Sequence, residues 1–568
     1  MRYLTLLILV YLAGCAAEPP EAPKADQGVS STEEPEQTQT LAERAGAPLF
    51  DGMGSYERKI STSDPDAQKY FNQGMVLAFA FNHAESVRSF RAAQTLDPTC
   101  AMCFWGEALA TGPNINVTSN GKVVMSDDER RNAFAALQKA IELKSNAGQS
   151  EQDYIDALAA RYNGEPDTDR EPLDQAWADA MGRVAQKYPD DMDAASIYAE
   201  ALMNTMPWNY WADDGNPKPA TVKVIESLEG VLEQAPDHPL ALHLYIHAVE
   251  ASSNPGRAEA AADRLLALVP GAGHLVHMPA HIYWRIGRYH DASNANIEAA
   301  RVDEAYIAQC NAQGFYPALY YPHNIHFLWA ASTMEGRSEL SIESAFRVAN
   351  NVNVEQVKQF PTVEFFRTIP LLSYVRFGKW DEILAHPAEP EEFKFSQGIR
   401  HYARGVAFAS QGDIQKAMEE QAKIPALVET TSVEFMSKRG YPGNTLLQIA
   451  NDLLLGEIAY VQDDFAKAIT HFEAAVSEQD QLPYTEPPFW YYPSRQSLGQ
   501  VLMDASQFSD AEAVYRKDLA DYPRNGWSMF GLMKALEAQG KTAEAAEVKS
   551  MFDEVWQMAD VELSASRI

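Results

Sequence analysis

From about residue 64 to residue 560, the chain alternates stretches in which apolar and small residues recur every three or four positions. This period places the apolar residues on one face of a helix, and short polar or proline-containing breaks separate the stretches. No stretch requires the two-residue alternation that is typical of a strand. The pattern therefore predicts an all-α protein built from successive helical pairs.

The helical pairs repeat with a period of 34 residues. Small residues at two fixed steps of the unit let the paired helices approach closely, and aromatic residues and a closing proline occupy other fixed steps. Further copies place Gly405, Gly456 and Gly499 at the first of the two small-residue steps. Units of this length stack side by side, so we expect an elongated array. The first clear unit starts at Ala67 and contains Tyr70, Gly74, Ser86, Phe90, Ala93 and Pro98.

This spacing resembles the tetratricopeptide repeat. The resemblance implies an all-α fold, a right-handed superhelix (α-solenoid) of about eleven or twelve helical hairpins. At a finer level, the runs Cys100-Ala-Met-Cys-Phe-Trp-Gly, Tyr321-Pro-His-Asn-Ile-His-Phe and Glu486-Pro-Pro-x-Trp resemble a large family of long bacterial tetratricopeptide-repeat lipoproteins without an established activity. We interpret Pro487-Pro488 with Trp490 as a rigid turn rather than as a lid over the groove.

The first residues predict that the protein is located in the bacterial cell envelope. Arg2 and the apolar run from Leu4 to Leu12, followed by Ala13-Gly14-Cys15, are typical of a secretory signal and resemble a lipobox. We therefore expect that Cys15 is lipidated and that the lipid anchors the protein to the outer membrane, facing the periplasm. The alternative is an ordinary cleaved signal peptide. We divide the chain into a signal peptide (1–15), a disordered tether (16–50), N-terminal repeats with insertions (51–236), histidine-rich repeats (237–350) and C-terminal repeats with a cap (351–568).

The net charge and the cysteine content limit the kinds of partner and cofactor that we expect. The chain has 46 Lys and Arg against 79 Asp and Glu, a net charge of −33, so a nucleic-acid partner is not expected. The membrane is expected to be contacted through the lipid anchor only. Cys100 and Cys103 form one C-x-x-C that lacks the following histidine of a haem attachment site. A local disulfide, two buried thiols or metal ligation are open for this pair.

Nine of the thirteen histidines lie between His238 and His326. His243 and His247 precede His277 and His281 by 34 residues, the length of one repeat. Residues four apart share a helix face, so each pair offers two imidazoles on one ridge and stacking lays the ridges side by side. Neutral imidazole is the commonest protein ligand of transition metals. The pattern predicts a metal site on the inner wall of the solenoid.

The register of the repeat extends this set to nine candidate ligands. In tetratricopeptide-repeat proteins the stripe that holds these positions lines the concave surface, as the resemblance implies here. Geometry permits one mononuclear site or two close ones. The candidate ligands are His243, His247, His277, His281, His323, His326, His274, Glu250 and Glu200.

The donor types favour a transition metal ion, and Zn, Cu or Fe suits such a set. The H-E-x-x-H signature of zinc proteases is absent, because Leu244 and Met278 occupy the position of the general base. Two alternatives without a metal remain: the histidines bind an anionic ligand or peptide, or they form a buried network that stiffens the repeats.

Three functions compete at this stage. The first is a lipid-anchored scaffold that holds a metal and binds a protein or small-molecule partner in its concave groove. The second is a metalloenzyme, an oxidoreductase or a metal-assisted hydrolase, that uses the same histidines. The third is a protein-interaction scaffold without metal. The sequence does not decide whether the chain is an enzyme, and it assigns no catalytic residue.

Overall fold

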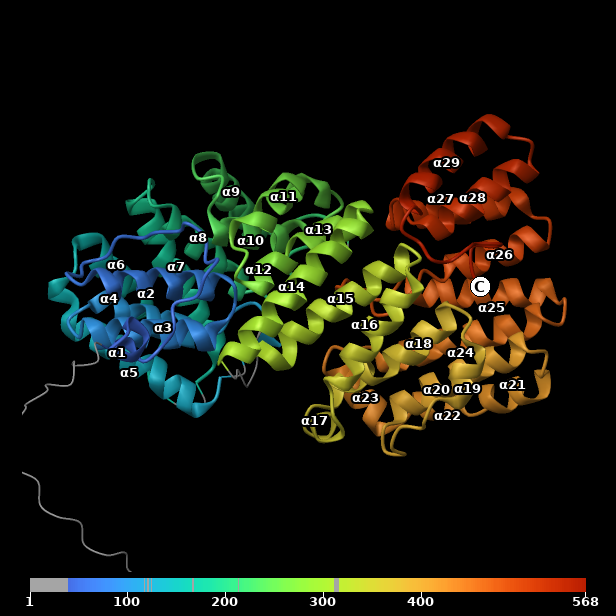
Figure 1. The fold of residues 1–568 in the computed structure, drawn as a ribbon, viewed down its shortest axis with the longest axis horizontal. Coiled ribbons are helices and arrows are strands. Elements are labelled where there is room, and N and C mark those ends of the chain that lie inside the picture. Colours follow the sequence, from blue (N-terminus) through green and yellow to red (C-terminus); the bar gives the residue numbers. More distant parts are fainter. Residues whose placement is uncertain are drawn as a thin grey trace, which may run out of the picture.

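The structure is a computed structural model that describes residues 39–116, 118–119, 122–123, 125–165, 168–212, 214–310 and 316–568. The helices stack into an elongated array that runs from α2–α8 at one end, through α10–α15, to the C-terminal helices at the other (Figure 1). Cys15 lies outside the described residues. No helix in the described ranges is long and apolar enough to cross a bilayer.

Successive helical pairs account for most of the described chain, so the expected α-solenoid is confirmed. The pairs are α2 (Pro65–Phe79) with α3 (His83–Leu96), α4 (Ala101–Thr111) with α5 (Asp127–Leu143), α6 (Gln149–Leu158) with α7 (Arg170–Lys187), α8 (Met192–Asn204) with α9 (Pro219–Gln234), α10 (Pro239–Val249) with α11 (Glu259–Leu268), α12 (Gly273–His277) and α13 (Pro279–Ile286) with α14 (Tyr289–Cys310), α15 (Tyr321–Met334) with α16 (Ser338–Asn350), α18 (Ile369–Arg376) with α19 (Trp380–Ala385), α20 (Lys394–Ser410) with α21 (Ile414–Gln421), α24 (Gly443–Tyr460) with α25 (Phe465–Gln479), α26 (Arg495–Asp504) with α27 (Phe508–Asp521), and α28 (Gly526–Ala538) with α29 (Thr542–Val555).

The remaining elements are short and lie between or before the pairs. They are α1 (Leu41–Ala45), α17 (Val354–Gln359), α22 (Ile424–Val428), α23 (Thr431–Lys438), the 3-10 turns η1 (Lys144–Asn146), η2 (Pro255–Ala258) and η4 (Pro361–Thr368), and the π-helical turn η3 (Tyr316–Tyr320). One antiparallel ladder of two residues a strand, β1 (Thr118–Ser119) with β2 (Lys122–Val123), lies in the insertion between α4 and α5. The sequence pattern did not predict this ladder.

Close packing within the pairs depends on glycines that face aromatic rings. A Cβ added at Gly74 would lie 2.8 Å from the ring of Phe90, and one added at Gly456 would lie 2.5 Å from the ring of Phe472. Gly106 on α4 meets the same Phe90 ring, at 2.3 Å. The small-residue steps of the repeat therefore exist because an aromatic ring from the second helix occupies the space of a side chain.

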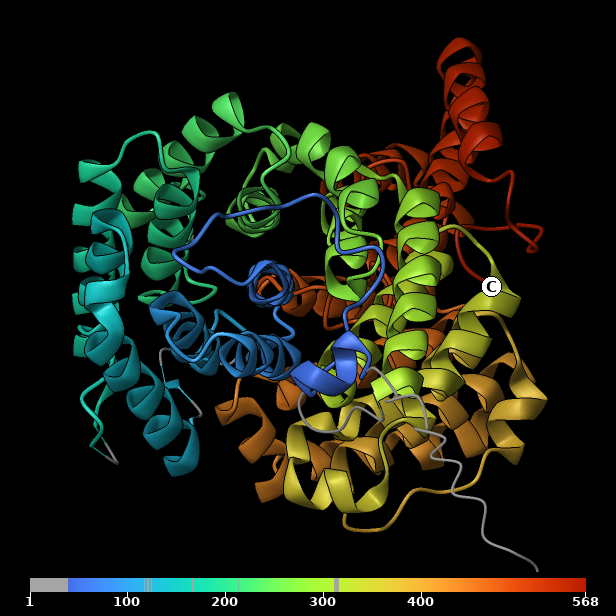
Figure 2. The ribbon, with the colours of Figure 1, turned by 60° about the vertical axis from the view of Figure 1, so that its left-hand side comes forward.

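The segment that follows α1 packs against the repeats instead of leaving them. The Tyr70 hydroxyl donates to the Ala47 carbonyl at 2.6 Å, and the Arg58 guanidinium bonds Asp193 on α8 at 2.7 Å. The amide of Gly271, just before α12, donates to the Gly52 carbonyl at 2.9 Å. Figure 2 shows this coil, in dark blue, crossing the inner side of the arc of N-terminal helices. We call residues 47–62 the N-terminal strap; it ties α2, α8 and the start of α12 together.

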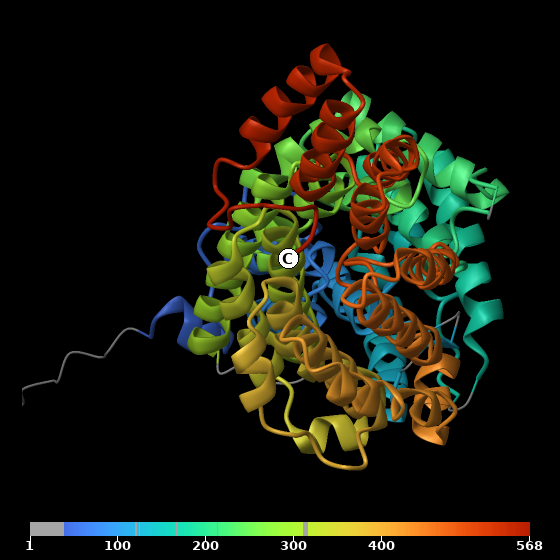
Figure 3. The same ribbon diagram turned by 90° about the vertical axis from the view of Figure 1, so that its right-hand side faces the viewer.

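The C-terminal repeats return to contact the middle of the array. The indole N–H of Trp527 on α28 donates to the Thr333 carbonyl on α15 at 3.0 Å. The Asp560 carboxylate accepts from the Ser338 amide at the start of α16 at 2.6 Å. Figure 3 shows the C-terminal helices, in orange and red, beside the green and yellow helices of the middle repeats. Residues from the last third of the chain therefore reach the helices that carry the histidines.

We expect Gly106→Ala to lower the free energy of unfolding by about 1–3 kcal/mol, because the new methyl group overlaps the Phe90 ring and α3 and α4, from neighbouring pairs, must separate. Gly230→Ala on α9 is the matched control: it is also helical and its Cβ meets nothing within 4 Å, so alanine should be neutral or stabilising by up to about 1 kcal/mol. Urea melts followed by circular dichroism measure both. Equal midpoints for the two variants would contradict this account of the packing.

Candidate metal centre

Three consecutive repeats supply the histidines from their first helices. α10 carries His243 and His247, and α15 carries His323. The helix between them is interrupted at Pro279, which has no N–H to donate, so α12 ends at His277 and α13 carries His281. All eleven residues of α10 are buried, because its neighbours cover it on every side. The histidines therefore lie inside the array and not on its outer surface.

The structure gathers six of the seven predicted histidine ligands and Glu250 into contiguous groups. The ligand atoms within each group lie within 4.8 Å of one another. All members are buried except His323, which is partly exposed. Three ligands within this distance can be drawn onto one ion by small side-chain rotations. The groups are His243, His247 and His274; His277, His281 and His323; and His247, Glu250 and His281.

Hydrogen bonds fix the tautomer of two of these imidazoles. His243 Nδ1 lies 2.6 Å from the carbonyl oxygen of Phe79, and His277 Nδ1 lies 2.6 Å from Oδ1 of Asn296. The Asn296 amide nitrogen donates to the Ala292 carbonyl at 2.8 Å, so its oxygen is the atom that faces His277. Both oxygens can only accept, so each ring has its proton on Nδ1 and a lone pair on Nε2. This is the arrangement of metal-ligating histidines.

The Glu250 carboxylate fixes two more imidazoles in the same way. Its Oε1 accepts from His247 Nδ1 at 2.7 Å, and its Oε2 accepts from His281 Nδ1 at 2.7 Å. Glu486, on the segment between α25 and α26, also contacts His281 Nδ1. The Arg285 guanidinium contacts the Glu250 carbonyl oxygen and lies over the ring of Tyr484. The lone pairs of His247 and His281 are thereby also placed on Nε2.

Burial and mutual proximity favour the neutral form of four histidines of the cluster. Burial lowers the pKa of His243, His274, His277 and His323 well below the ordinary value, and neighbouring histidines lower it further. Burial and the negative charge of Glu250 raise the pKa of Glu486 well above its usual range.

Glu250 behaves in the opposite way to Glu486. Burial alone would raise its pKa, but His281, His247 and a hydrogen bond from Glu486 together hold that pKa well below the usual range. The opposite directions of the two pKa shifts favour a single negative charge on this pair of carboxyl groups. Neutral imidazoles beside one carboxylate are the donor set that a transition metal ion requires.

Several buried nitrogens of the cluster have no hydrogen-bond partner among the described residues. They are Nε2 of His243, Nε2 of His247 and both ring nitrogens of His274. Nε2 of His277 lies 2.8 Å from Nε2 of His281, although the Nδ1 atoms of both rings already carry the protons. Two lone pairs at this distance repel unless a proton or a cation lies between them.

Two aromatic residues with left-handed backbones flank His247. Phe81 has φ 56° and lies in the turn between α2 and α3, where the equivalent turn after α13 has Gly287 at φ 80°. Trp208 has φ 59°. A bulky residue in this region costs roughly 1–2 kcal/mol. The Phe81 ring lies 4.5 Å from the His243 ring, and the Trp208 ring meets His247 edge-on at 5.1 Å. The strain is located where the rings cover the histidines.

Two predicted ligands lie apart from these groups. Burial raises the pKa of Glu200 on α8, and the charge of Arg161 acts in the opposite direction. His326 stacks on Trp329 at 5.2 Å, and burial lowers its pKa to about 3. The two residues His323 and His326 are about 60° apart around α15, and the His326 ring packs on Trp329, Phe365 and Phe366 instead of on the cluster.

Other predicted residues have clear positions. Cys100 and Cys103 form a disulfide at the start of α4, with Cα atoms 5.4 Å apart. Glu486 was not among the predicted ligands. The segment that contains Glu486 contacts the cluster, so the interpretation of Pro487-Pro488 as a simple turn was wrong and the rejected alternative, a segment lying over the groove, describes it better.

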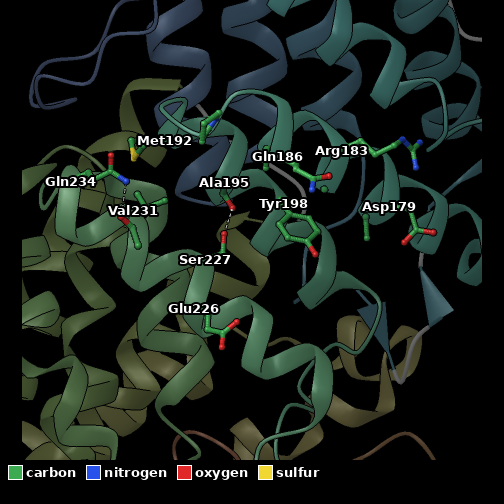
Figure 4. Close-up of a pocket in the computed structure, with 15 residues that line it drawn as sticks. Asp179, Arg183, Gln186, Met192, Ala195, Tyr198, Glu226, Ser227, Val231 and Gln234 are labelled. Atoms are coloured by element: carbon green, nitrogen blue, oxygen red, sulfur yellow. Dashed lines mark hydrogen bonds between the residues drawn. The ribbon is translucent and has the colours of Figure 1, made fainter.

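A separate surface hollow of about 770 Å³ lies between α7, α8 and α9 (Figure 4). Its wall includes Arg183, Gln186 and Tyr198, and the Ser227 hydroxyl donates to the Ala195 carbonyl at 3.0 Å. None of the predicted site residues lines this hollow. The chemistry of the chain is concentrated in the histidine cluster instead.

A match to a known family was found in the C-terminal repeats. Residues 497–548, which cover most of the chain from α26 to α29, match the tetratricopeptide repeat family. The same glycine-to-aromatic packing occurs in this segment, at Gly499 and Tyr515, and in the first repeat, at Gly74 and Phe90. The C-terminal part of the chain therefore contains the tetratricopeptide repeat. No curated protein sequence matches the chain.

Solved structures match the fold of the chain with low TM-scores. A human IFIT1 dimer with m7Gppp-AAAA is 12% identical with a TM-score of 0.28, and covers 87% of this chain and 90% of its own. Yeast Tom70 is 12% identical with a TM-score of 0.27, and covers 85% and 89%. The P58(IPK) TPR domain is 11% identical with a TM-score of 0.20, and covers 84% and 99%. Likeness at this level carries no information on ligands or partners.

A buried carboxyl group supports the helix that carries His274. Asp303 on α14 accepts from the Tyr316 hydroxyl at 2.8 Å and from the Asn324 amide at 2.7 Å. The Tyr316 hydroxyl in turn accepts from the His274 backbone amide at 3.1 Å. Burial raises the pKa of Asp303 from 3.8 to about 7. The folded protein therefore prefers the protonated form, and the stability that this preference provides is lost as the pH rises from about 4 through about 7.

We expect Asp303→Asn, which imitates the protonated carboxyl, to gain stability relative to the parent protein as the pH rises from 5 to 8. The shift in pKa limits the gain to at most about 4 kcal/mol. Urea melts at both pH values measure it, and the difference between the two proteins cancels the titration of the histidines. The exposed Asp190→Asn variant is the control and should follow the parent protein. A difference that does not change with pH would contradict this assignment.

Proposed function

We propose that this protein is a lipid-anchored, periplasm-facing scaffold whose concave face holds a transition metal ion at the histidine cluster. The observation that carries the proposal is the common orientation of His243, His247, His277 and His281. Each donates its Nδ1 proton to a backbone, amide or carboxylate oxygen, so each directs its Nε2 lone pair at the other imidazoles. A network that only stiffens the repeats would instead pair these nitrogens with donors.

The donor set restricts the ion. Imidazole nitrogens with one carboxylate suit Zn, Cu or Fe, whereas Mg and Ca require oxygen ligands. His243, His247, His274, His277, His281 and His323 would supply the nitrogens. Glu250 and Glu486 would orient the rings and balance the charge.

The scaffold role rests on the repeat fold. Helical repeat arrays offer extended concave surfaces for proteins and small molecules. Solved IFIT1 contains a capped RNA oligonucleotide, but the net charge of −33 disfavours a nucleic acid here. We therefore favour a protein or small-molecule partner.

The location follows from the N-terminal sequence and from the cysteines. Leu4 to Leu12 with Cys15 form the expected lipoprotein signal. The disulfide between Cys100 and Cys103 fits an oxidising compartment such as the periplasm.

A metalloenzyme is the second candidate, and one observation favours it. His323 is partly exposed, whereas the other histidines of the cluster are buried, so solvent and small molecules reach the cluster on that side. Three protein ligands on an ion leave a position open, as in catalytic zinc sites. An ion held in this way polarises a bound substrate or lowers the pKa of bound water.

We expect the full chain, purified without chelator and without a histidine tag, to retain metal that elemental mass spectrometry detects. The double variant His243→Ala/His281→Ala should lose this metal, because each substitution removes an Nε2 lone pair that faces the cluster. His290→Ala is the matched control, since that side chain is half exposed and pairs with Glu335 away from the cluster.

Chelation gives an independent readout of the same site. An ion that binds only the folded state raises the melting temperature, so EDTA should lower it in the parent protein and in His290→Ala but not in the double variant. Metal-free parent protein after addition of Zn, Cu and Fe would overturn the proposal and leave a scaffold without metal.

A further inference from the structure

The six histidines divide into two sets that share no member. His243, His247 and His274 form the first set, and His277, His281 and His323 form the second. We call them the first trio and the second trio. The first trio spans α10 and α12, and the second spans α12, α13 and α15. Each trio therefore bridges one contact between neighbouring repeats.

The trios are built alike. Each contains two imidazoles whose Nδ1 proton is held by an oxygen outside the trio, and one further imidazole. Nitrogens bound to one tetrahedral ion at 2.0–2.1 Å lie about 3.3 Å apart. The 4.8 Å limit within each trio is therefore close to a coordination shell, and small side-chain rotations complete it.

Glu250 lies between the trios and serves both. One oxygen holds His247 of the first trio and the other holds His281 of the second, each at 2.7 Å. These are hydrogen-bond lengths, and they leave both Nε2 atoms free to bind ions on the far sides of the rings. Across the boundary, the His247 and His281 rings are 5.3 Å apart and the His274 and His277 rings are 5.7 Å apart. The trios are thus contiguous parts of one buried cluster.

We infer that the site is dinuclear: each trio holds its own transition metal ion, and Glu250 orients one ligand of each. This inference rests on the proposed metal site and adds its stoichiometry and its ligand class. Three nitrogen ligands leave each ion with an open coordination position, in contrast to the four protein ligands of a structural zinc site. His323 is the partly exposed member of the two trios, so we expect the open position of the second trio to accept a small ligand such as water or azide and not a peptide side chain.

The test is a metal titration of the full chain after removal of bound metal. Zn(II) is added in steps, and native mass spectrometry counts the ions on each molecule. His243→Gln with His274→Gln disables the first trio, and His277→Gln with His323→Gln disables the second; His290→Gln is the control. We expect two ions in the parent protein and in the control, and one ion in each double variant.

Each other outcome points to a different error. One ion in the parent protein, lost in both double variants, would overturn the dinuclear centre and leave a single site. One ion in the parent protein that persists in both double variants would place it at His247, Glu250 and His281, the group that neither variant touches, and would also overturn the inference. No ion in the parent protein would overturn the proposed function itself. The count in the parent protein decides even where a variant fails to fold.

Co(II) tests the open positions in the parent protein. The Co(II)-loaded protein should change its visible absorption when azide is added, because azide enters a vacant position and alters the ligand field. An unchanged spectrum at saturating azide would overturn the small-ligand part of the inference.

Discussion

The Glu250 carboxylate is the group on which the arrangement of the cluster depends. It is fully buried at the C-terminal end of α10, and it stays ionised only because His247, His281 and Glu486 face it. Removing a charge from water costs several kcal/mol unless polar partners replace the water. The imidazole protons supply these partners, and in doing so they fix the direction of the lone pairs. One buried charge thus determines which nitrogens are available to an ion.

The repeat fold brings these groups together and the superhelix completes the set. Stacking of α10, α12 and α15 aligns histidines that are one repeat apart in sequence. The return of the C-terminal repeats then places Glu486 against His281, 205 residues away. Contacts such as Trp527 with Thr333 hold the two regions together. The carboxylate pair therefore exists only when the superhelix has closed on itself, which couples the long-range fold to the local chemistry.

The period of 34 residues was sufficient to predict the solenoid and the convergence of His243, His247, His277 and His281, because stacking repeats a position at a fixed place. Glu486 could not be found in this way. Its position depends on the curvature accumulated over many repeats, and no local pattern encodes that sum. His326 lies apart from the cluster because its ring packs on Trp329 and on Phe366 of the following segment, and the repeat register does not encode these contacts. The insertion with β1 and β2 has no repeat register at all, so its ladder was not predictable from the period.

The left-handed backbone of Phe81 is better explained by a role at the histidine cluster than by packing alone. At the turn after the first helix of a repeat, glycine adopts the left-handed conformation without cost, and this chain uses it at Gly287 and Gly336. At the equivalent turn after α2 the residue is Phe81. The left-handed conformation costs free energy for this residue, but its ring covers the rings of His243, His247 and His274. A packing role alone would be met by glycine and a larger neighbour. The strain is explained if excluding water from the lone pairs strengthens their interaction with an ion, since electrostatic attraction rises as the local dielectric constant falls.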